Sequence, residues 1–151
     1  MRGVLMRIWL VVAVLLSGMV QADTRGMPVT ATVPGSCKFS NADDVVLDFG
    51  ALVPGQGARQ VSQSVAFTCS TGTQYTVAMD LGRNPDGQQR RMRGDSGSYI
   101  PYALSATPTS GNGQGELTPI SLLLTASVEA AAYVDSPIGS YNDNVVLTVS
   151  P

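Results

Sequence analysis

Residues able to carry catalysis are few in this chain. Its 151 residues include no histidine, which excludes a Ser-His-Asp or Cys-His arrangement and removes the commonest metal ligand. Asp43 and Asp44 could form an acid–base pair, but adjacent side chains in a turn point apart, so we interpret them as a solvated loop. The thiols of Cys37 and Cys69 could act as nucleophiles only in reduced form. We therefore expect no enzyme, no cofactor and no metal site.

A group of charged side chains lies in residues 83–97, "RNPDGQQRRMRGDSG", here called the charged segment. It contains four arginines, Arg83, Arg90, Arg91 and Arg93, interspersed with Asp86 and Asp95. Such a segment could contact an anionic surface or a glycan, or hold Ca²⁺. Calcium loops need several closely spaced oxygen ligands, and this segment does not supply them. We expect opposite charges to offset one another on an exposed hairpin.

The first 22 residues have the composition of a secretory leader. Arg2 and Arg7 precede the apolar run Ile8–Leu16, and small residues at Val20 and Ala22 place a cut before Asp23. The apolar run is short for a membrane span, although an uncleaved anchor is the alternative. Removing residues 1–22 from 151 leaves 129, enough for one domain with a core. We expect a secreted chain.

Net charge and cysteine content limit the possible partners and the redox state of the protein. The leader holds two of the 9 Lys+Arg and none of the 11 Asp+Glu, so the mature chain has net charge −4, which argues against a nucleic-acid partner. In an oxidising compartment Cys37 and Cys69 are expected to form a disulfide. Closing that loop should stabilise the fold by about 3–4 kcal/mol. Two buried thiols, or one reactive cysteine, are the alternative.

The mature region has the alternation of β-strands throughout. Apolar and polar residues alternate with a period of two in residues 27–33, 45–50, 61–70, 75–81, 99–104, 120–128 and 145–150. Pro101 cannot donate to a ladder, so its strand should have an edge or a bulge there. A helix over residues 124–134 is the main alternative, because Ala130–Ala132 favour helix. Regular turn signals between the runs predict an immunoglobulin-like antiparallel β-sandwich.

The last strand raises a question of pairing. Val145, Leu147 and Val149 point to one side and Val146, Thr148 and Ser150 to the other. An unpaired strand edge offers free N–H and C=O groups to other chains. The sequence ends at Pro151, and no later strand is visible to cover that edge.

The order of several short motifs resembles a known family. "TATVPGSCKFS", "LDFG", "AFTCSTGTQYTVAMDLGRN" and "RRM" are followed by "PIGSYNDNVVLTVSP", which contains a Gly-x-Tyr-x-Asp turn at Gly139, Tyr141 and Asp143. This order is similar to the spore coat protein U domain family, which includes subunits of archaic chaperone–usher pili of the Csu type. The likeness covers residues from about 30 to 151.

The resemblance implies an incomplete immunoglobulin-like sandwich that is completed by a donor strand from another molecule. It implies a leader at 1–22, an N-terminal donor-strand extension at 23–33 and a β-sandwich domain at 34–151. Donor side chains would be Met27, Val29, Ala31 and Val33, and the acceptor groove would include Val145, Leu147 and Val149. The alternative for residues 27–33 is an ordinary first strand that folds back within its own domain.

The resemblance also implies partners and a function. The protein would be a pilus or fimbrial subunit for adhesion and biofilm formation, joined head-to-tail to neighbouring subunits as a homo- or hetero-polymer. A periplasmic chaperone would occupy the groove before assembly at an outer-membrane usher. A secreted spore or cell coat protein of the same family and a monomeric glycan-binding β-sandwich are the alternative functions.

Overall fold

The structure is a computed structural model that describes residues 21–151. The chain divides into two units, with the boundary between Thr32 and Val33. Residues 21–32 contain no helix or strand, and all their side chains are exposed. Apart from Gln21 and Ala22, the leader predicted at residues 1–22 lies outside the described residues.

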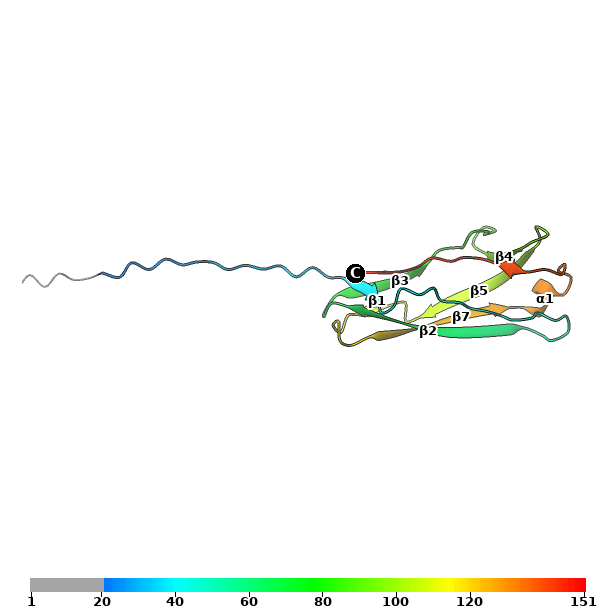
Figure 1. The fold of residues 1–151 in the computed structure, drawn as a ribbon, viewed down its shortest axis with the longest axis horizontal. Helices are drawn as coiled ribbons and strands as arrows, with labels where there is room; N and C mark the ends of the chain where they lie inside the picture. Colours follow the sequence, from blue (N-terminus) through cyan, green and yellow to red (C-terminus); the bar gives the residue numbers. More distant parts are fainter. Residues whose placement is uncertain (1–20) are drawn as a thin grey trace, which may run out of the picture. The chain divides into compact units, whose positions relative to one another are not determined.

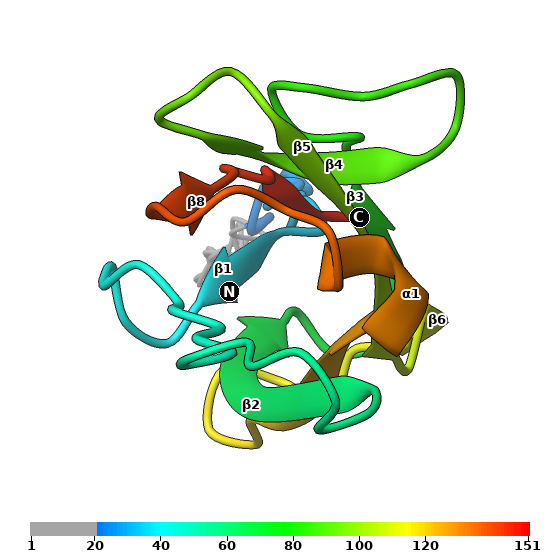
Figure 2. The ribbon, with the colours of Figure 1, turned by 90° about the vertical axis from the view of Figure 1, so that its right-hand side faces the viewer.

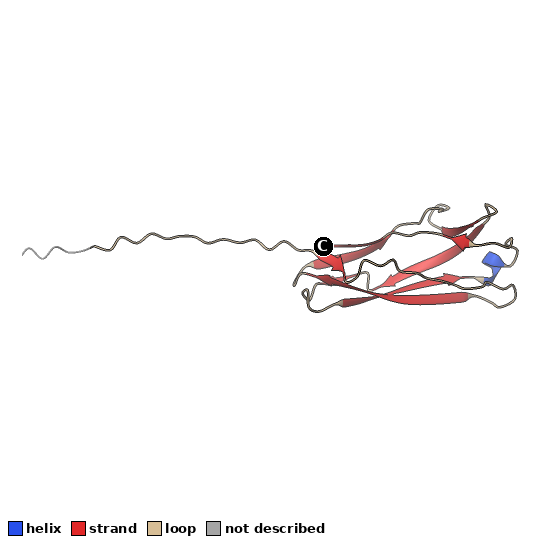
Figure 3. Cartoon of the chain, viewed as in Figure 1, coloured by secondary structure: helices blue, strands red, loops and turns tan. Residues whose placement is uncertain are grey.

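Residues 33–151 form an all-β body with one short helix (Figures 1 and 3). Its elements are β1 (Cys37–Phe39), β2 (Arg59–Cys69), β3 (Gln74–Met79), β4 (Arg90–Gly94), β5 (Tyr99–Thr107), β6 (Ser110–Asn112), β7 (Ile120–Val128), α1 (Ala130–Tyr133), β8 (Tyr141–Asn142) and β9 (Leu147–Ser150).

The strands pair into two antiparallel sheets. One has the order β1-β2-β7-β5-β4-β8, and the other has the order β6-β3-β9. Because β8 and β9 follow one another within residues 141–150, this last segment passes from the first sheet to the second. The arrangement is the immunoglobulin-like antiparallel β-sandwich that the sequence predicts.

Side chains that alternate toward the inside of the sandwich form two apolar clusters. The first consists of Phe49, Met92, Ile100, Tyr102, Ala126, Val128 and Tyr133. The second consists of Val65, Phe67, Cys69, Tyr75, Ala106, Leu122 and Leu124. Leu47 packs against both clusters, so the segment before Phe49 contributes to the whole length of the core.

A disulfide joins the short edge strand β1 of the first sheet to β2, the longest strand of that sheet. Cys37 of β1 is paired with Cys69 of β2 in the ladder and is bonded to it through sulfur. The three residues of β1 could contribute few ladder hydrogen bonds alone. The covalent link therefore holds the start of the body in register with β2.

The predicted strands at residues 61–70, 75–81, 99–104, 120–128 and 145–150 overlap β2, β3, β5, β7 and β9. The strand predicted at 45–50 is wrong as secondary structure, because no strand is assigned there. Residues 27–33 form no strand within this chain, and their role as a donor strand stays a prediction. No strand is predicted where β1, β4, β6 and β8 lie. These strands are short, and β4 lies among the arginines of residues 83–97. The helix alternative survives only as α1, after β7 has ended.

Pro101 shows how a central strand can accept proline. β5 pairs with β4 over Tyr99–Tyr102 and with β7 over Ala103–Thr107. Pro101 therefore lies where β5 has one neighbour only, so its missing N–H can face away from β4 without breaking a ladder.

Among residues 21–151, no helix has the length and apolar character needed to cross a membrane.

Replacing both Cys37 and Cys69 by serine should lower the free energy of unfolding by about 3 kcal/mol, because the unfolded chain regains the freedom of the closed loop. Guanidinium unfolding of the mature chain measures the change. Adding dithiothreitol should shift the wild-type midpoint by a similar amount and leave the double variant unchanged. Equal midpoints for the wild type and the variant would contradict this role.

Candidate binding groove

The body carries an open groove of about 770 Å³. One wall is residues 41–49, here called the lip segment, and the other is residues 141–147. These last residues belong to the edge segment, residues 141–150, which contains β8 and β9. Figure 2 looks roughly along the strands and shows the edge segment in red and the cyan chain that leads from β1 into the lip segment.

The floor of the groove is made of the core itself. Five strands of the body contribute the floor side chains, which are Val65, Met79, Met92, Tyr102, Leu104, Leu124 and Ala126. Each belongs to one of the two apolar clusters or packs against it. The sandwich is therefore open along this line, and an occupant with apolar side chains would extend the core.

The lip segment has the side-chain alternation of a strand without the pairing of one. Phe49 is buried, Leu47 is half-buried and Val45 is 41% exposed, while Val46 and Asp48 face solvent. The backbone N–H of Ser40 donates to Ala66 O at 2.9 Å just before the lip segment. At its other end the Arg59 guanidinium donates to Phe49 O at 3.4 Å. Within the described chain, no backbone–backbone hydrogen bond is recorded for residues 41–49.

The edge segment presents an unpaired edge to the groove. Its residues alternate strictly between half-buried and exposed, with Val145, Leu147 and Val149 half-buried. Asp80 N donates to Val146 O at 3.1 Å, so the main-chain groups of Val146 face β3. Since main-chain groups along a strand alternate in direction, those of Val145, Leu147 and Val149 face away from β3. Val145 and Leu147 line the groove opposite the lip segment.

Two carboxylates hold the edge segment where it passes between the sheets. Asp80 Oδ1 accepts hydrogen bonds from Val146 N at 2.9 Å and from Gly82 N at 3.0 Å. These bonds, with Val146 the larger cause, and the nearby Arg90 charge hold the pKa of the Asp80 carboxyl below its usual value. Arg90 also donates to Asp80 O at 2.6 and 2.8 Å.

Asp143 is the second support. Its Oδ1 accepts from Arg83 N at 2.8 Å, and its Oδ2 accepts from the Tyr102 hydroxyl at 2.7 Å. Burial, with this hydrogen bond, raises the pKa of Tyr102 above its usual value, so the hydroxyl stays a donor. A Cβ on Gly82 would lie 2.1 Å from Asp143 Oδ2, and Gly82 has φ +76°, so the turn requires glycine there.

Tyr141 fixes the start of the edge segment. Its hydroxyl donates to Pro137 O at 2.8 Å, four residues upstream, and lies 2.7 Å from Ser98 Oγ. A Cβ on Gly94 would lie 2.6 Å from the Tyr141 ring, so the ring packs directly on the β4 backbone. A tyrosine bonded to the upstream backbone marks the sixth strand, F, of immunoglobulin-like domains, whose seventh strand, G, lies beside it.

The structure brings together some of the residues that the sequence singled out. Val145 and Leu147 line the groove. Val149 is not among the lining residues and packs, partly buried, on the second apolar cluster. In the N-terminal extension, the side chains of Met27 and Val29 are 84% and 87% exposed. Their role as donor side chains stays a prediction.

Sequence reasoning missed most of the groove. Within the lip segment, the sequence predicts a paired strand only at residues 45–50 and a solvated loop at Asp43 and Asp44. It gives no sign that these residues line a groove. Nothing in the sequence connects Asp80 with Asp143, because they lie far apart in the chain. In the fold, hydrogen bonds from Val146 N to Asp80 and from Arg83 N to Asp143 place both carboxylates beside the edge segment. Tyr141 and Asp143 were found through the Gly-x-Tyr-x-Asp resemblance, without their structural roles.

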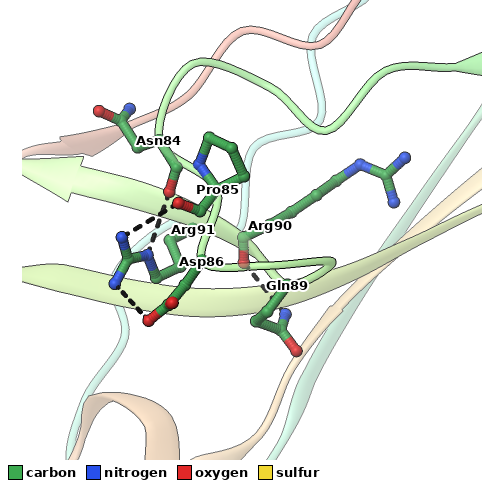
Figure 4. A network of polar contacts seen from close by, with 6 residues as sticks. All are labelled: Asn84, Pro85, Asp86, Gln89, Arg90 and Arg91. Carbon is green, nitrogen blue, oxygen red and sulfur yellow. Dashed lines mark hydrogen bonds and ion pairs between the residues drawn. The ribbon is translucent and has the colours of Figure 1, made fainter.

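Within the charged segment, residues 83–97, the turn before β4 binds the Arg91 guanidinium (Figure 4). Arg91 donates to Asp86 Oδ2 at 3.0 Å, to Asn84 O at 3.1 Å and to Pro85 O at 3.3 Å. Its guanidinium also lies over the Tyr99 ring, 4.3 Å from the centroid. Among residues 21–151, no group of three or more Cys, Asp or Glu side chains is arranged to hold a metal ion.

Comparison with protein families gives a match over most of the chain. The Spore Coat Protein U domain family matches residues 23–148, and the chain belongs to this family. The matched range includes the lip segment and most of the edge segment. A comparison with curated protein sequences finds no significant match.

Two solved structures are similar to the chain. One is the chaperone–tip adhesion subunit pre-assembly complex CsuC–CsuE from archaic chaperone-usher Csu pili of Acinetobacter baumannii, at 25% identity and TM-score 0.49 over 78% of this chain. The other is a chaperone–tip adhesin complex described for CFA/I fimbriae biogenesis, at 14% identity and TM-score 0.43 over 78%. This chain spans only 40% and 41% of those chains. Both TM-scores are low, so the family membership rests on the domain match.

Replacing Asp80 by asparagine should destabilise the body in a pH-dependent way. A carboxyl whose pKa is lowered by folding stabilises the fold above its unfolded pKa, about 4, and loses that contribution as pH falls through the folded pKa. Thermal unfolding at about pH 7 should therefore show a lower Tm for Asp80→Asn, and the difference should shrink by about pH 3. Asp135→Asn, at an exposed turn, is the control. A difference that is constant with pH would contradict the proposed support.

Proposed function

We propose that this protein is a structural subunit of a surface fibre, and that copies join by donor-strand exchange. Residues 23–33 of one copy would occupy the groove of the next. The observation that carries the proposal is the groove itself, because its floor is the apolar core and one wall is an unpaired strand edge. A contact between one end of a copy and the groove of another is head-to-tail and propagates.

The extension has the chemistry that the groove requires. Met27, Val29, Ala31 and Val33 share one side of an extended chain, with Pro28, Thr30 and Thr32 on the other. Met27, Val29 and Val33 are each more than 80% exposed. Burying each of these three side chains would contribute about 1.5–3 kcal/mol, and the ladder to the edge segment would satisfy its free main-chain groups.

Pro28 selects the direction of the inserted strand. The groove-facing residues of the edge segment, Val145 and Leu147, also have their main-chain groups toward the groove. In an antiparallel pair, residues directly opposite one another have their side chains on the same face. A residue whose main-chain groups point across the gap bonds to the residue opposite it, so Met27 and Val29, with side chains in the groove, would bond to the edge segment. In a parallel pair the alternate residues would bond instead, including Pro28, which has no N–H. The sequence therefore favours antiparallel insertion.

The remaining partners follow from the family resemblance. A periplasmic chaperone would cover the groove until an outer-membrane usher exchanges it for the extension of the next subunit. That route begins with the secretory leader at residues 1–22 and ends at the cell surface. Adhesion and biofilm formation would be properties of the assembled fibre, and the chain would have a structural role without catalysis.

A matched pair of substitutions in the extension tests the proposal. Val29→Asn places an amide in the apolar groove and should weaken each subunit contact by about 3 kcal/mol, or roughly 100-fold. Thr30→Asn changes the neighbouring side chain, which faces solvent, and should leave assembly intact. Size-exclusion chromatography with light scattering on mature protein, co-expressed with a candidate chaperone, measures the polymer.

Both variants should still form a one-to-one complex with the chaperone, since the groove is unchanged. The proposal is wrong if the two variants polymerise equally well. It is also wrong if the mature chain is a stable monomer at all concentrations.

A further inference from the structure

The extension of each copy begins beside the groove of the same copy. The body starts at Val33, and Ser36 is held in place because the Ser70 N–H donates to Ser36 O at 2.9 Å. Phe39, only three positions further along, already lines the groove. A segment tethered this close to a site has an effective concentration in the millimolar range. The extension of a second copy at micromolar concentration therefore competes at a disadvantage, unless the groove discriminates between the two.

The two extensions would enter the groove in different directions. Figure 1 shows β1 and the C-terminus at one end of the body, here called the near end, and α1 at the other, here called the far end. The edge segment runs from the far end, after α1, to the C-terminus at the near end. An extension that turns back into its own groove enters at the near end, so it lies parallel to the edge segment. An extension from a second copy is free to lie antiparallel.

The length of the extension excludes a detour that would reverse its direction in its own groove. Residues 23–33 span at most about 36–40 Å when fully extended. The edge segment along the groove, residues 141–147, is about 20 Å long. The extension can therefore pass along the body once, and it cannot first reach the far end outside the groove and then return through it.

Pro28 penalises the parallel direction. There, the alternate residues 28, 30 and 32 direct their main-chain groups at the edge segment. With Val33 beside Val149 at the near end, Pro28 would lie beside Asn144, and the carbonyl of Asp143 would receive no hydrogen bond, because proline has no N–H. Burying one acceptor without a donor weakens the inserted state roughly 5- to 150-fold. In the antiparallel direction Pro28 faces the lip segment, which has no ladder to lose.

The order of side chains favours the same direction. The near half of the groove has an apolar floor, made by Phe39, Val65, Met79 and Leu124. In the far half, Tyr102 and Asp143 line the groove, and the Tyr102 hydroxyl donates to Asp143 Oδ2 at 2.7 Å. Antiparallel insertion puts Met27, the largest apolar side chain of the extension, in the near half and the small Ala31 toward the carboxylate. Parallel insertion would put Met27 against Asp143, where burying apolar surface beside a charge gains little.

We propose that Pro28 keeps the extension of each copy out of its own groove, so that the groove takes the extension of a second copy. This inference rests on the proposed strand exchange, and it adds how the chain avoids closing on itself. A self-closed copy would be a complete sandwich with no free extension and no open groove, so it could not join a fibre. The missing N–H offsets much of the advantage that tethering gives to the chain's own extension.

Capture of a free peptide by isolated copies tests the inference. The mature chain is attached sparsely to a surface through a C-terminal tag, so that no second copy lies within reach, and a fluorescent peptide of residues 23–33 reports open grooves. The wild type should capture the peptide. Pro28→Thr should capture it with an apparent affinity roughly 10-fold lower, because its own extension now competes. Adding Thr30→Pro to Pro28→Thr returns a proline to the same side of the strand and should restore capture.

A peptide that carries Pro28→Thr is the matched control. It should bind the wild-type chain as tightly as the natural peptide does, because residue 28 of an antiparallel strand does not bond to the edge segment. Equal capture by the wild-type and Pro28→Thr chains, no restoration by Thr30→Pro, or tighter binding of the altered peptide would each overturn the inference and leave the proposed function standing. Capture of the peptide by none of the chains would overturn both.

Discussion

An unpaired strand edge above an exposed core is the constraint on which the rest of this structure depends. The main-chain groups of Val145 and Leu147 face a groove whose floor is the interior of the sandwich. Hydrogen-bonding groups and apolar side chains both gain by the addition of one extended chain at this place. Water can satisfy the free hydrogen-bonding groups but leaves the apolar side chains exposed. The groove therefore favours a strand with alternate apolar residues over any compact polar ligand.

The other unusual features of the body keep that opening in a fixed shape. Asp80 and Asp143 hold the edge segment through main-chain N–H groups where no strand can pair with it. Tyr141 ties the same segment to Pro137 and Ser98. On the opposite wall, the hydrogen bond from Ser40 N to Ala66 O and the buried Phe49 hold the two ends of the lip segment, which has no ladder of its own. A groove with fixed walls can receive a strand without first rearranging, which reduces the entropy cost of binding.

Local patterns in the sequence were sufficient for the strands that have two neighbours or a long ladder, as in the alternation around Phe67 and Leu122. They predicted the face of the last strand correctly, because burial follows a period of two. Local patterns could not show that Val45, Leu47 and Phe49 lack a neighbouring strand. Alternation indicates which side of a segment is buried, but it does not indicate whether the backbone is hydrogen-bonded to another strand. The carboxylate supports depend on a turn that brings Asp80 and Asp143 together, and no local pattern encodes that contact. The short strand β4 could not be predicted because its arginines obscure the alternation of apolar and polar residues.

Residue-resolved hydrogen exchange tests the open edge most directly. NMR would follow the backbone amides of residues 145–150 in the mature Val29→Asn chain, before and after addition of a peptide of residues 23–33. The account predicts fast exchange at Val145, Leu147 and Val149 without the peptide, strong slowing when it is bound, and little change at Val146, Thr148 and Ser150. Protection of the first three amides without the peptide, or no slowing with it, would contradict the claim that this edge awaits a strand from another copy.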